Sequence, residues 1–200
     1  MTRKCTRVTL TAMSALRRTS IILTVVLAAG VSAVVAQDRP TSLLRSALIV
    51  TDVERSRRFY ELFGFRAEAG FDNPRDPARS PFPLASPSTR TRLVILSSAS
   101  GVGGRLGLVE FSGPTPPDAR RDASKTAIGD VVLVLDVADA EAVHRTLQTA
   151  QAAIVGPPQI YVSRQRAPDG APMQGKVFHV RDPDGYLIEV LEPPARVGEP

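Results

Sequence analysis

Apolar and polar residues alternate over several short segments of this chain, and two other segments repeat apolar residues at helical spacing. In the first half, the helical spacing begins after Asp52, which suits an N-cap, and ends near Gly64, which suits the left-handed residue after a helix. Alternation predicts the strands of this half at 43–50, 65–70, 91–98 and 105–111.

The second half repeats this order of strand, helix and three strands. A strand is predicted at 130–136 and a helix at 137–151, with His144 on the polar side of the helix. The last three strands are predicted within 153–163, 176–181 and 186–192. The duplication predicts an α+β fold in one domain, 41–195, made of two β-α-β-β-β modules at about 43–112 and 127–193.

A long connection, 71–89, interrupts the first module. It holds five prolines and little periodicity, and it is longer than an ordinary connection. The sequence therefore leaves open whether this segment is a lid, a binding loop or disordered.

The first 36 residues differ in composition from the rest of the chain. They contain five cations and no acid, and the apolar run 21–36 follows Arg17-Arg18 and ends in small residues. This order predicts a secretory signal peptide, 1–36, and a periplasmic or secreted protein that begins at Gln37. The alternative is an uncleaved N-terminal segment that anchors the protein in a membrane. Met13 is an alternative start.

Charge and cysteine content narrow the possible partners. The chain has 25 basic and 20 acidic residues, and without the five cations of the leader the body has 20 of each. We therefore expect no nucleic-acid partner, and no membrane partner once the leader is cleaved. The one cysteine, Cys5, lies in the leader, which excludes disulfides and cysteine chemistry from the rest. A monomer and a homodimer are both compatible with this composition.

A histidine and a glutamate stand within the two apolar strands that flank Asp182-Pro183-Asp184-Gly185. Asp-Pro-Asp favours a type I turn, and Gly185 suits the left-handed residue of a three-residue hairpin with a bulge. This register pairs Asp182 with Tyr186 and sets His179 opposite Glu189. It also places four apolar residues together on the other face of the hairpin: Phe178, Val180, Ile188 and Val190.

The pair of His179 and Glu189 is a candidate catalytic site, because a carboxylate beside an imidazole orients the ring for acid or base chemistry. Arg181 lies on the same face of its strand as His179 and is a candidate ligand-binding residue. The alternative is a buried hydrogen bond that only satisfies the two polar groups.

Two motifs resemble the vicinal oxygen chelate superfamily, which includes glyoxalase I, bleomycin-resistance proteins and extradiol dioxygenases. SALIVTDVERSRRFYELFGF, 46–65, is similar to its opening module, and RDPDGYLIEVLEP, 181–193, is similar to its closing hairpin. The resemblance covers about 43–193 and implies two modules whose sheets curl into an eight-stranded, open, barrel-like cavity. It implies a small-molecule ligand in that cavity.

The resemblance also implies four inward positions, on the first and last strand of each module, where metal-dependent relatives carry histidine or glutamate. These positions match Arg45, Glu110, Gly129 and Glu189 here, so both expected histidines are absent. We therefore expect no metal cofactor, with Arg45 and Glu110 as ligand-binding residues and the Arg45 guanidinium in the place of the metal. An Arg45 that points outward into solvent is the other interpretation of that residue.

An alternative keeps a metal in the cavity. Glu110, Glu189 and His179 would hold a divalent ion such as zinc, nickel, manganese or iron, and the protein would be a lyase, isomerase or dioxygenase with an altered ligand set. The preferred interpretation is an exported protein that binds a compact small molecule without the usual metal, and the sequence leaves open whether it is an enzyme.

Overall fold

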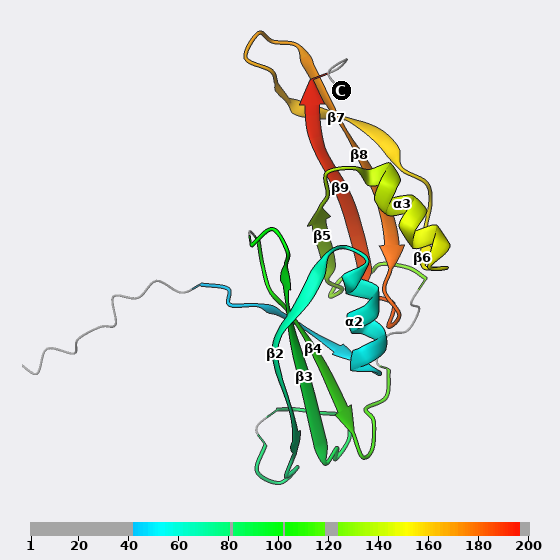
Figure 1. Cartoon of the computed structure of the whole chain (residues 1–200). Coiled ribbons are helices and arrows are strands. Elements are labelled where there is room, and N and C mark those ends of the chain that lie inside the picture. Colours follow the sequence, from blue (N-terminus) through cyan, green and yellow to red (C-terminus); the bar gives the residue numbers. More distant parts are fainter. Residues whose placement is uncertain (1–41, 81, 102, 119–123, 197–200) are drawn as a thin grey trace, which may run out of the picture. The chain divides into compact units, whose positions relative to one another are not determined.

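The computed structural model describes residues 42–80, 82–101, 103–118 and 124–196, and the compact unit within it is Leu43–Pro200. The described residues form two helices and nine strands (Figure 1). The predicted signal peptide lies outside the described residues. None of the helices in the described ranges has the length and apolar character needed to cross a membrane.

The first module forms a four-stranded sheet with one helix. Its elements are β1 Ser46–Val50, α2 Val53–Glu61, β2 Phe65–Pro74, β3 Arg90–Ser98 and β4 Leu106–Ser112. The strand order is β1-β4-β3-β2, in which β1 runs parallel to β4 and the other pairs are antiparallel. The helix therefore crosses from the first strand of the sheet to the edge strand that lies farthest from it.

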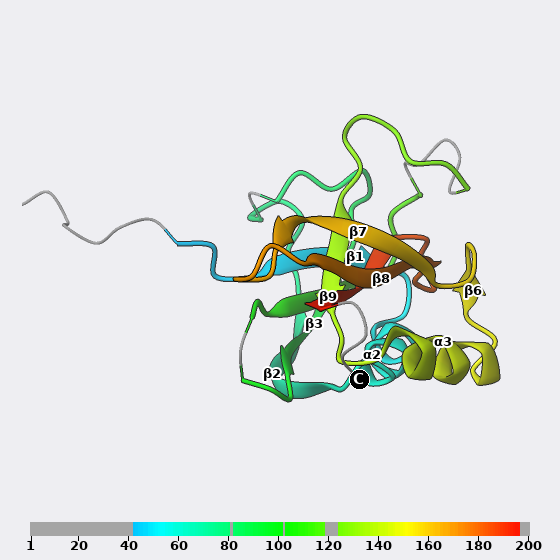
Figure 2. The same ribbon diagram turned by 90° about the horizontal axis from the view of Figure 1, so that it is seen from above.

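The second module repeats this arrangement with one short additional strand. Its elements are β5 Val132–Asp136, α3 Ala140–Thr149, β6 Ala153–Ile154, β7 Gln159–Arg166, β8 Pro172–Arg181 and β9 Leu187–Arg196. The order is β5-β9-β8-β6, and β7 also pairs with β8. Helices α2 and α3 lie near each other (Figure 2), and residues at the C-terminal ends of both line one depression.

The predicted α+β fold with two β-α-β-β-β modules is confirmed, with three differences. The strands form two separate sheets of four and five strands and do not close into a barrel. Helix α3 begins at Ala140 and not at Val137, because the Asp139 side chain caps it by accepting from the backbone N–H of Ala142. The strand predicted within 153–163 divides into β6 and β7, since the intervening Pro157 and Pro158 have no N–H to donate to a ladder.

The second helix also differs from its prediction at His144. This side chain was expected on the polar side, but its ring lies edge-on against the ring of Phe178, with centroids 5.3 Å apart. His144 is therefore part of the contact between α3 and β8, and it is half-buried.

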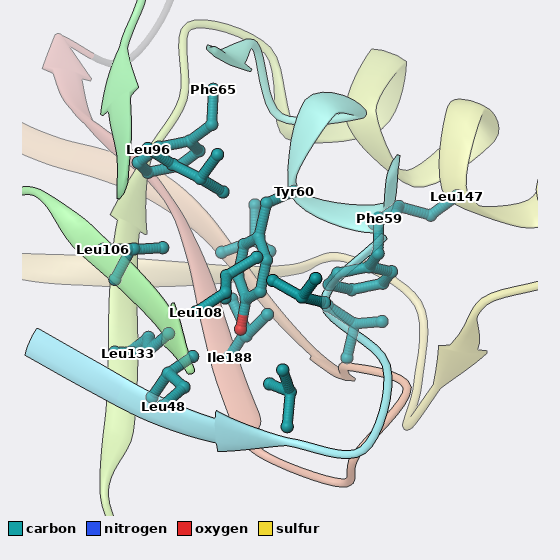
Figure 3. Close-up of a cluster of buried hydrophobic side chains, with 14 of the residues drawn as sticks. Leu48, Phe59, Tyr60, Phe65, Leu96, Leu106, Leu108, Leu133, Leu147 and Ile188 are labelled. Carbon is teal, nitrogen blue, oxygen red and sulfur yellow. The ribbon is translucent and has the colours of Figure 1, made fainter. Parts of the chain in front are cut away.

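One hydrophobic core joins the two modules. The predicted apolar patch of the closing hairpin is buried in it, with Val180, Ile188 and Val190 completely inaccessible to solvent. Helix α2 contributes Phe59 and Tyr60 to the same core, and Figure 3 shows the ring of Tyr60 within this cluster. The first module's helix thus packs against residues from both sheets, and neither module buries its apolar face alone.

The hairpin turn of the second module is tied to α2 by buried carboxylates. Tyr60 donates its hydroxyl to Oδ2 of Asp182 at 3.0 Å, and Ser56 donates to Oδ2 of Asp184 at 2.9 Å. Asp184 Oδ1 also accepts from the backbone N–H of Thr51 at 3.0 Å. Burial raises the pKa of Asp182, and burial together with the adjacent Asp182 carboxylate raises the pKa of Tyr60.

We predict that Tyr60→Phe lowers the free energy of unfolding by about 1–3 kcal/mol, because it leaves a buried carboxylate oxygen of Asp182 without its donor. Urea denaturation followed by circular dichroism measures the change. The control is Tyr186→Phe, which removes a hydroxyl that is only partly buried against the backbone of Ile49 and should cost less. Equal midpoints for the Tyr60 variant and the unaltered protein would contradict the role assigned to this bond.

Candidate functional site

His179 and Glu189 lie side by side on the face of the second sheet that is turned away from α3. The two residues are direct cross-strand partners, as predicted, and His179 Nε2 lies 3.3 Å from Glu189 Oε2. The predicted bulged turn is present, since Asp182 donates its N–H to the carbonyl of Tyr186 and Gly185 has a φ of 85°. The two side chains are 40% and 34% exposed, so the pair can be reached by a ligand and is not a buried structural bond.

Tyr161 lies farther along the second sheet than the pair. It lies on β7 opposite Gly175 of β8, where an added Cβ would come within 2.8 Å of the tyrosine ring. The pKa of Tyr161 is raised by partial burial, then by the negative charge of Glu189, and then by that of Asp136. The hydroxyl itself donates to the backbone carbonyl of Glu192 at 3.5 Å.

Sequence reasoning missed Tyr161 because no turn fixes the register of β7 as the Asp-Pro-Asp-Gly turn fixes that of β9. Two register irregularities, one in the β7–β8 pairing and one in the β8–β9 pairing, decide which face each β7 side chain takes. Gly175 was the available signal, since a glycine within an alternating strand marks a bulge or a close approach.

Apolar side chains surround these polar groups. Val132 and Val134 of β5 are 38% and 58% exposed, and they pair with Leu187 and Glu189 of β9. The face therefore offers exposed valines beside a carboxylate and an imidazole. This combination of apolar surface and a few hydrogen-bonding groups is typical of small-molecule sites.

Glu110 lies on the opposite face of its sheet from the one predicted. Its Oε2 accepts from the backbone N–H of Val53, the first residue of α2, at 3.0 Å. In the second module Glu192 does the same for Ala140, the first residue of α3, at 2.8 Å. Glu110 is therefore the counterpart of Glu192, and the counterpart of Glu189, three residues earlier, is Gly107.

The Arg45 side chain lies on the helix-free face of the first sheet, in contact with Gly107. Its Cδ and Nε would lie 3.2 and 3.3 Å from a Cβ at that glycine. The expected position of Arg45 between two carboxylates is not found, because Glu110 is on the other face. Gly129 is not the counterpart of Arg45 in the second module. Arg45 lies seven residues before the N-cap of α2, and the residue seven before the observed N-cap of α3, Asp139, is Val132.

The donor set does not fit the metal-bound alternative. His179 and Glu189 are adjacent, but Glu110 is held at the start of α2, and no group of three potential metal ligands occurs among the described residues. A catalytic zinc site needs three protein ligands in reach of one ion. We therefore derive no chemistry through a metal at this pair.

Arg181 is held by the hairpin turn. Its Nη1 donates to the carbonyl of Gly185 at 3.0 Å. The residue also lines a depression of about 500 Å³ between the ends of α2 and α3, together with residues such as Phe59, Leu62 and Ala152. This depression includes neither His179 nor Glu189, so the central cavity implied by the family resemblance is not the space that Arg181 lines.

The proline-rich connection folds onto the helix-free face of the first sheet. Strand β2 continues to Pro74, and the connection proper begins at Arg75. Phe82 packs on Phe111 of β4 with ring centroids 5.4 Å apart, and Arg75 lies 5.9 Å above the same ring. This segment therefore covers the end of the sheet where Phe111 lies.

The chain belongs to the glyoxalase/bleomycin resistance protein/dioxygenase superfamily, whose family model matches residues 42–190. A search of curated proteins finds no match. Among solved structures, the chain is similar to a glyoxalase family protein from Bacillus cereus, with 18% identity and a TM-score of 0.60 over 78% of this chain and 97% of that one. It is also similar to glyoxalase I from Zea mays, with 17% identity and a TM-score of 0.50 over 76% of this chain and 44% of that one. At these identities the structures support the fold alone.

We predict that Glu110→Gln and Glu192→Gln each lower the free energy of unfolding by about 0.5–2 kcal/mol, because each weakens the contact between a carboxylate and a helix N-terminus. Thermal or urea unfolding measures this change. Elemental analysis after loading with zinc, nickel, manganese and iron(II) should give the same metal content for Glu110→Gln as for the unaltered protein. A stoichiometric metal that is lost only in Glu110→Gln would overturn the helix-capping role.

Proposed function

We propose that this chain is an exported small-molecule-binding protein of the superfamily, which holds its ligand on the helix-free face of the second sheet without a bound metal. The single observation that carries this proposal is the exposed pair of His179 and Glu189, 3.3 Å apart, on a sheet face that is otherwise largely apolar. A ligand can reach both side chains, and the pair combines a hydrogen-bond acceptor with a ring that can donate or accept.

The chemistry of the two side chains limits the ligand. Glu189 accepts hydrogen bonds, and the imidazole of His179 donates or accepts them. The chain contains no tryptophan and only 5% aromatic residues, which leaves little surface for stacking a large planar molecule. These features favour a compact ligand with at least one donor, at least one acceptor and an apolar part that covers Val132 and Val134.

Proton transfer is a second candidate function for the same pair. The contact through Nε2 leaves Nδ1 of His179 without a partner among the described residues, and a ring oriented by a carboxylate is suited to take or give a proton there. Binding alone and catalysis differ in one observable, since only catalysis converts the bound compound into a product.

We predict that His179→Ala and Glu189→Gln each weaken ligand binding at least tenfold, because each removes one of the two polar contacts. The measurement is a screen of compact polar compounds by ¹H–¹⁵N NMR, followed by titration of the compounds that shift β8 and β9 resonances. The matched control is His144→Gln, since His144 is the other histidine of the chain and lies on α3, with its ring against Phe178 on the opposite side of the sheet from the pair. Unchanged affinity in both site variants, with folded spectra, would rule out this face as the site.

We predict that the exported protein begins at Gln37, because the basic, apolar and small-residue order of 1–36 matches a secretory signal. Cell fractionation followed by intact-mass measurement of the released protein tests this. A mass that includes the leader, in a membrane fraction, would instead support the uncleaved anchor.

A further inference from the structure

We propose that the depression between the C-terminal ends of α2 and α3 is a second ligand site, in which Gln151 and Arg58 bind the carboxylate of a compact organic acid with an apolar body. This inference goes beyond the function proposed for the pair of His179 and Glu189 and does not rest on it. It follows from the lining of the depression, from the backbone conformation of one lining residue and from a guanidinium without a partner.

The depression has the size and the lining of a small-molecule site. Its volume of about 500 Å³ is typical of ligand pockets. Phe59 and Leu62 of α2 and Ala152 after α3 give it an apolar lining, and all three belong to the hydrophobic core or pack against it. This apolar surface is therefore held in place by the core and is suited to cover the apolar part of a ligand.

Gln151, which follows α3, has a backbone conformation that favours glycine. Its φ is 54°, and every other described residue with a positive φ is a glycine. The corresponding residue after α2 is Gly64, with a φ of 82°, since each of the two lies twelve residues after the N-cap of its helix, Asp139 or Asp52. A side chain in this conformation is strained, and strained residues of this kind cluster at ligand sites.

The side chain of Gln151 is available to a ligand. Gln151 lines the depression, it is exposed, and its amide makes no hydrogen bond with any described residue. A side-chain amide supplies two N–H donors and an acceptor oxygen. No contact within the described part of the chain therefore accounts for a glutamine at this strained position, whereas a ligand in the depression would.

The unpaired charge of the depression is positive. Arg58 lines it, is exposed and makes no hydrogen bond or ion pair with any described residue. The carboxylate in the lining, Asp182, is buried, and its Oδ1 accepts from two backbone N–H groups while its Oδ2 accepts from Tyr60. The Arg181 guanidinium donates to the carbonyl of Gly185. Arg58 is thus the charged group that an anionic ligand can bind.

The chemistry of the ligand follows from these groups. The guanidinium of Arg58 and the amide N–H groups of Gln151 all donate, and a carboxylate accepts from both kinds of donor in charge-assisted hydrogen bonds. The C-terminal ends of α2 and α3 carry partial negative charge, which opposes a multiply charged anion. A monocarboxylate with an apolar body that covers Phe59 and Leu62 therefore fits the depression better than a phosphate.

The test is calorimetric titration of the full chain with 4-methylpentanoate and phenylacetate, and with the neutral amides of the same shapes. We expect saturable binding of the two carboxylates and at least tenfold weaker binding of the amides and of inorganic phosphate. Arg58→Gln should weaken carboxylate binding at least tenfold. The matched control is Arg66→Gln, which removes an exposed cation from β2 and should leave carboxylate affinity unchanged.

A glycine substitution separates a ligand-binding role of Gln151 from a structural one. Gln151→Gly relieves the backbone strain, so we expect the melting temperature to rise by about 1–4 °C while carboxylate affinity falls about fivefold. The converse change, Gly64→Gln, places the same strain after α2, where an added Cβ meets no atom within 4 Å. It should lower the melting temperature and leave carboxylate affinity unchanged.

His179→Ala distinguishes this site from the one proposed on the second sheet, because it should leave carboxylate affinity unchanged. Any of the following would overturn the proposal: no saturable carboxylate binding, equal binding of carboxylates and amides, phosphate binding as tight as that of the carboxylates, or full affinity in a folded Arg58→Gln or Gln151→Gly protein. A melting temperature that falls in Gln151→Gly would overturn it as well, since the glutamine would then stabilise the chain without a ligand.

Discussion

The hydrogen bond from Tyr60 to Asp182 is the contact on which the rest of the arrangement depends. It joins the helix of the first module to the hairpin turn of the second in a place where both groups are buried, and Asp184 adds contacts to Ser56 and Thr51 beside it. A carboxylate in such a place is stable only while its donors remain, because burial disfavours its charge. The turn is thereby fixed, the turn fixes the register of β8 and β9, and the register sets His179 beside Glu189.

The two modules share the contact that holds the start of the helix and differ on the opposite face of the sheet. Both use a glutamate on the last strand to hold the first N–H of the helix, which offsets unpaired donors at that end. Glu189 and Glu192 are three residues apart, an odd separation, so they point to opposite faces of their strand. The helix side is under the same constraint in both modules, whereas the opposite face is free to vary: it carries Glu189 in one sheet and Gly107 with Arg45 in the other.

Local features of the chain predicted most of the fold. Asp52 and Gly64 mark the limits of the first helix, the alternating segments mark the strands, and the Asp-Pro-Asp-Gly turn led to the correct pairing of His179 with Glu189. The errors occurred where two local signals competed. Asp136 and Asp139 both suit the residue before a helix, and only the structure shows that Asp136 ends β5 while Asp139 caps α3. Glu110 was matched by its motif alone, and the motif does not say which of two glutamates in the second module is its counterpart.

The sequence by itself determined the elements, the duplication and the register of the closing hairpin, because these depend on periodicity and on turn residues close together in the chain. Only the tertiary structure decided which glutamate reaches a helix, that the Tyr161 ring lies against Gly175, and that Arg45 lies next to Gly107. Each of these depends on contacts between strands that are distant in sequence, and a shift of one residue in any of those pairings would move the side chain to the other face of its sheet.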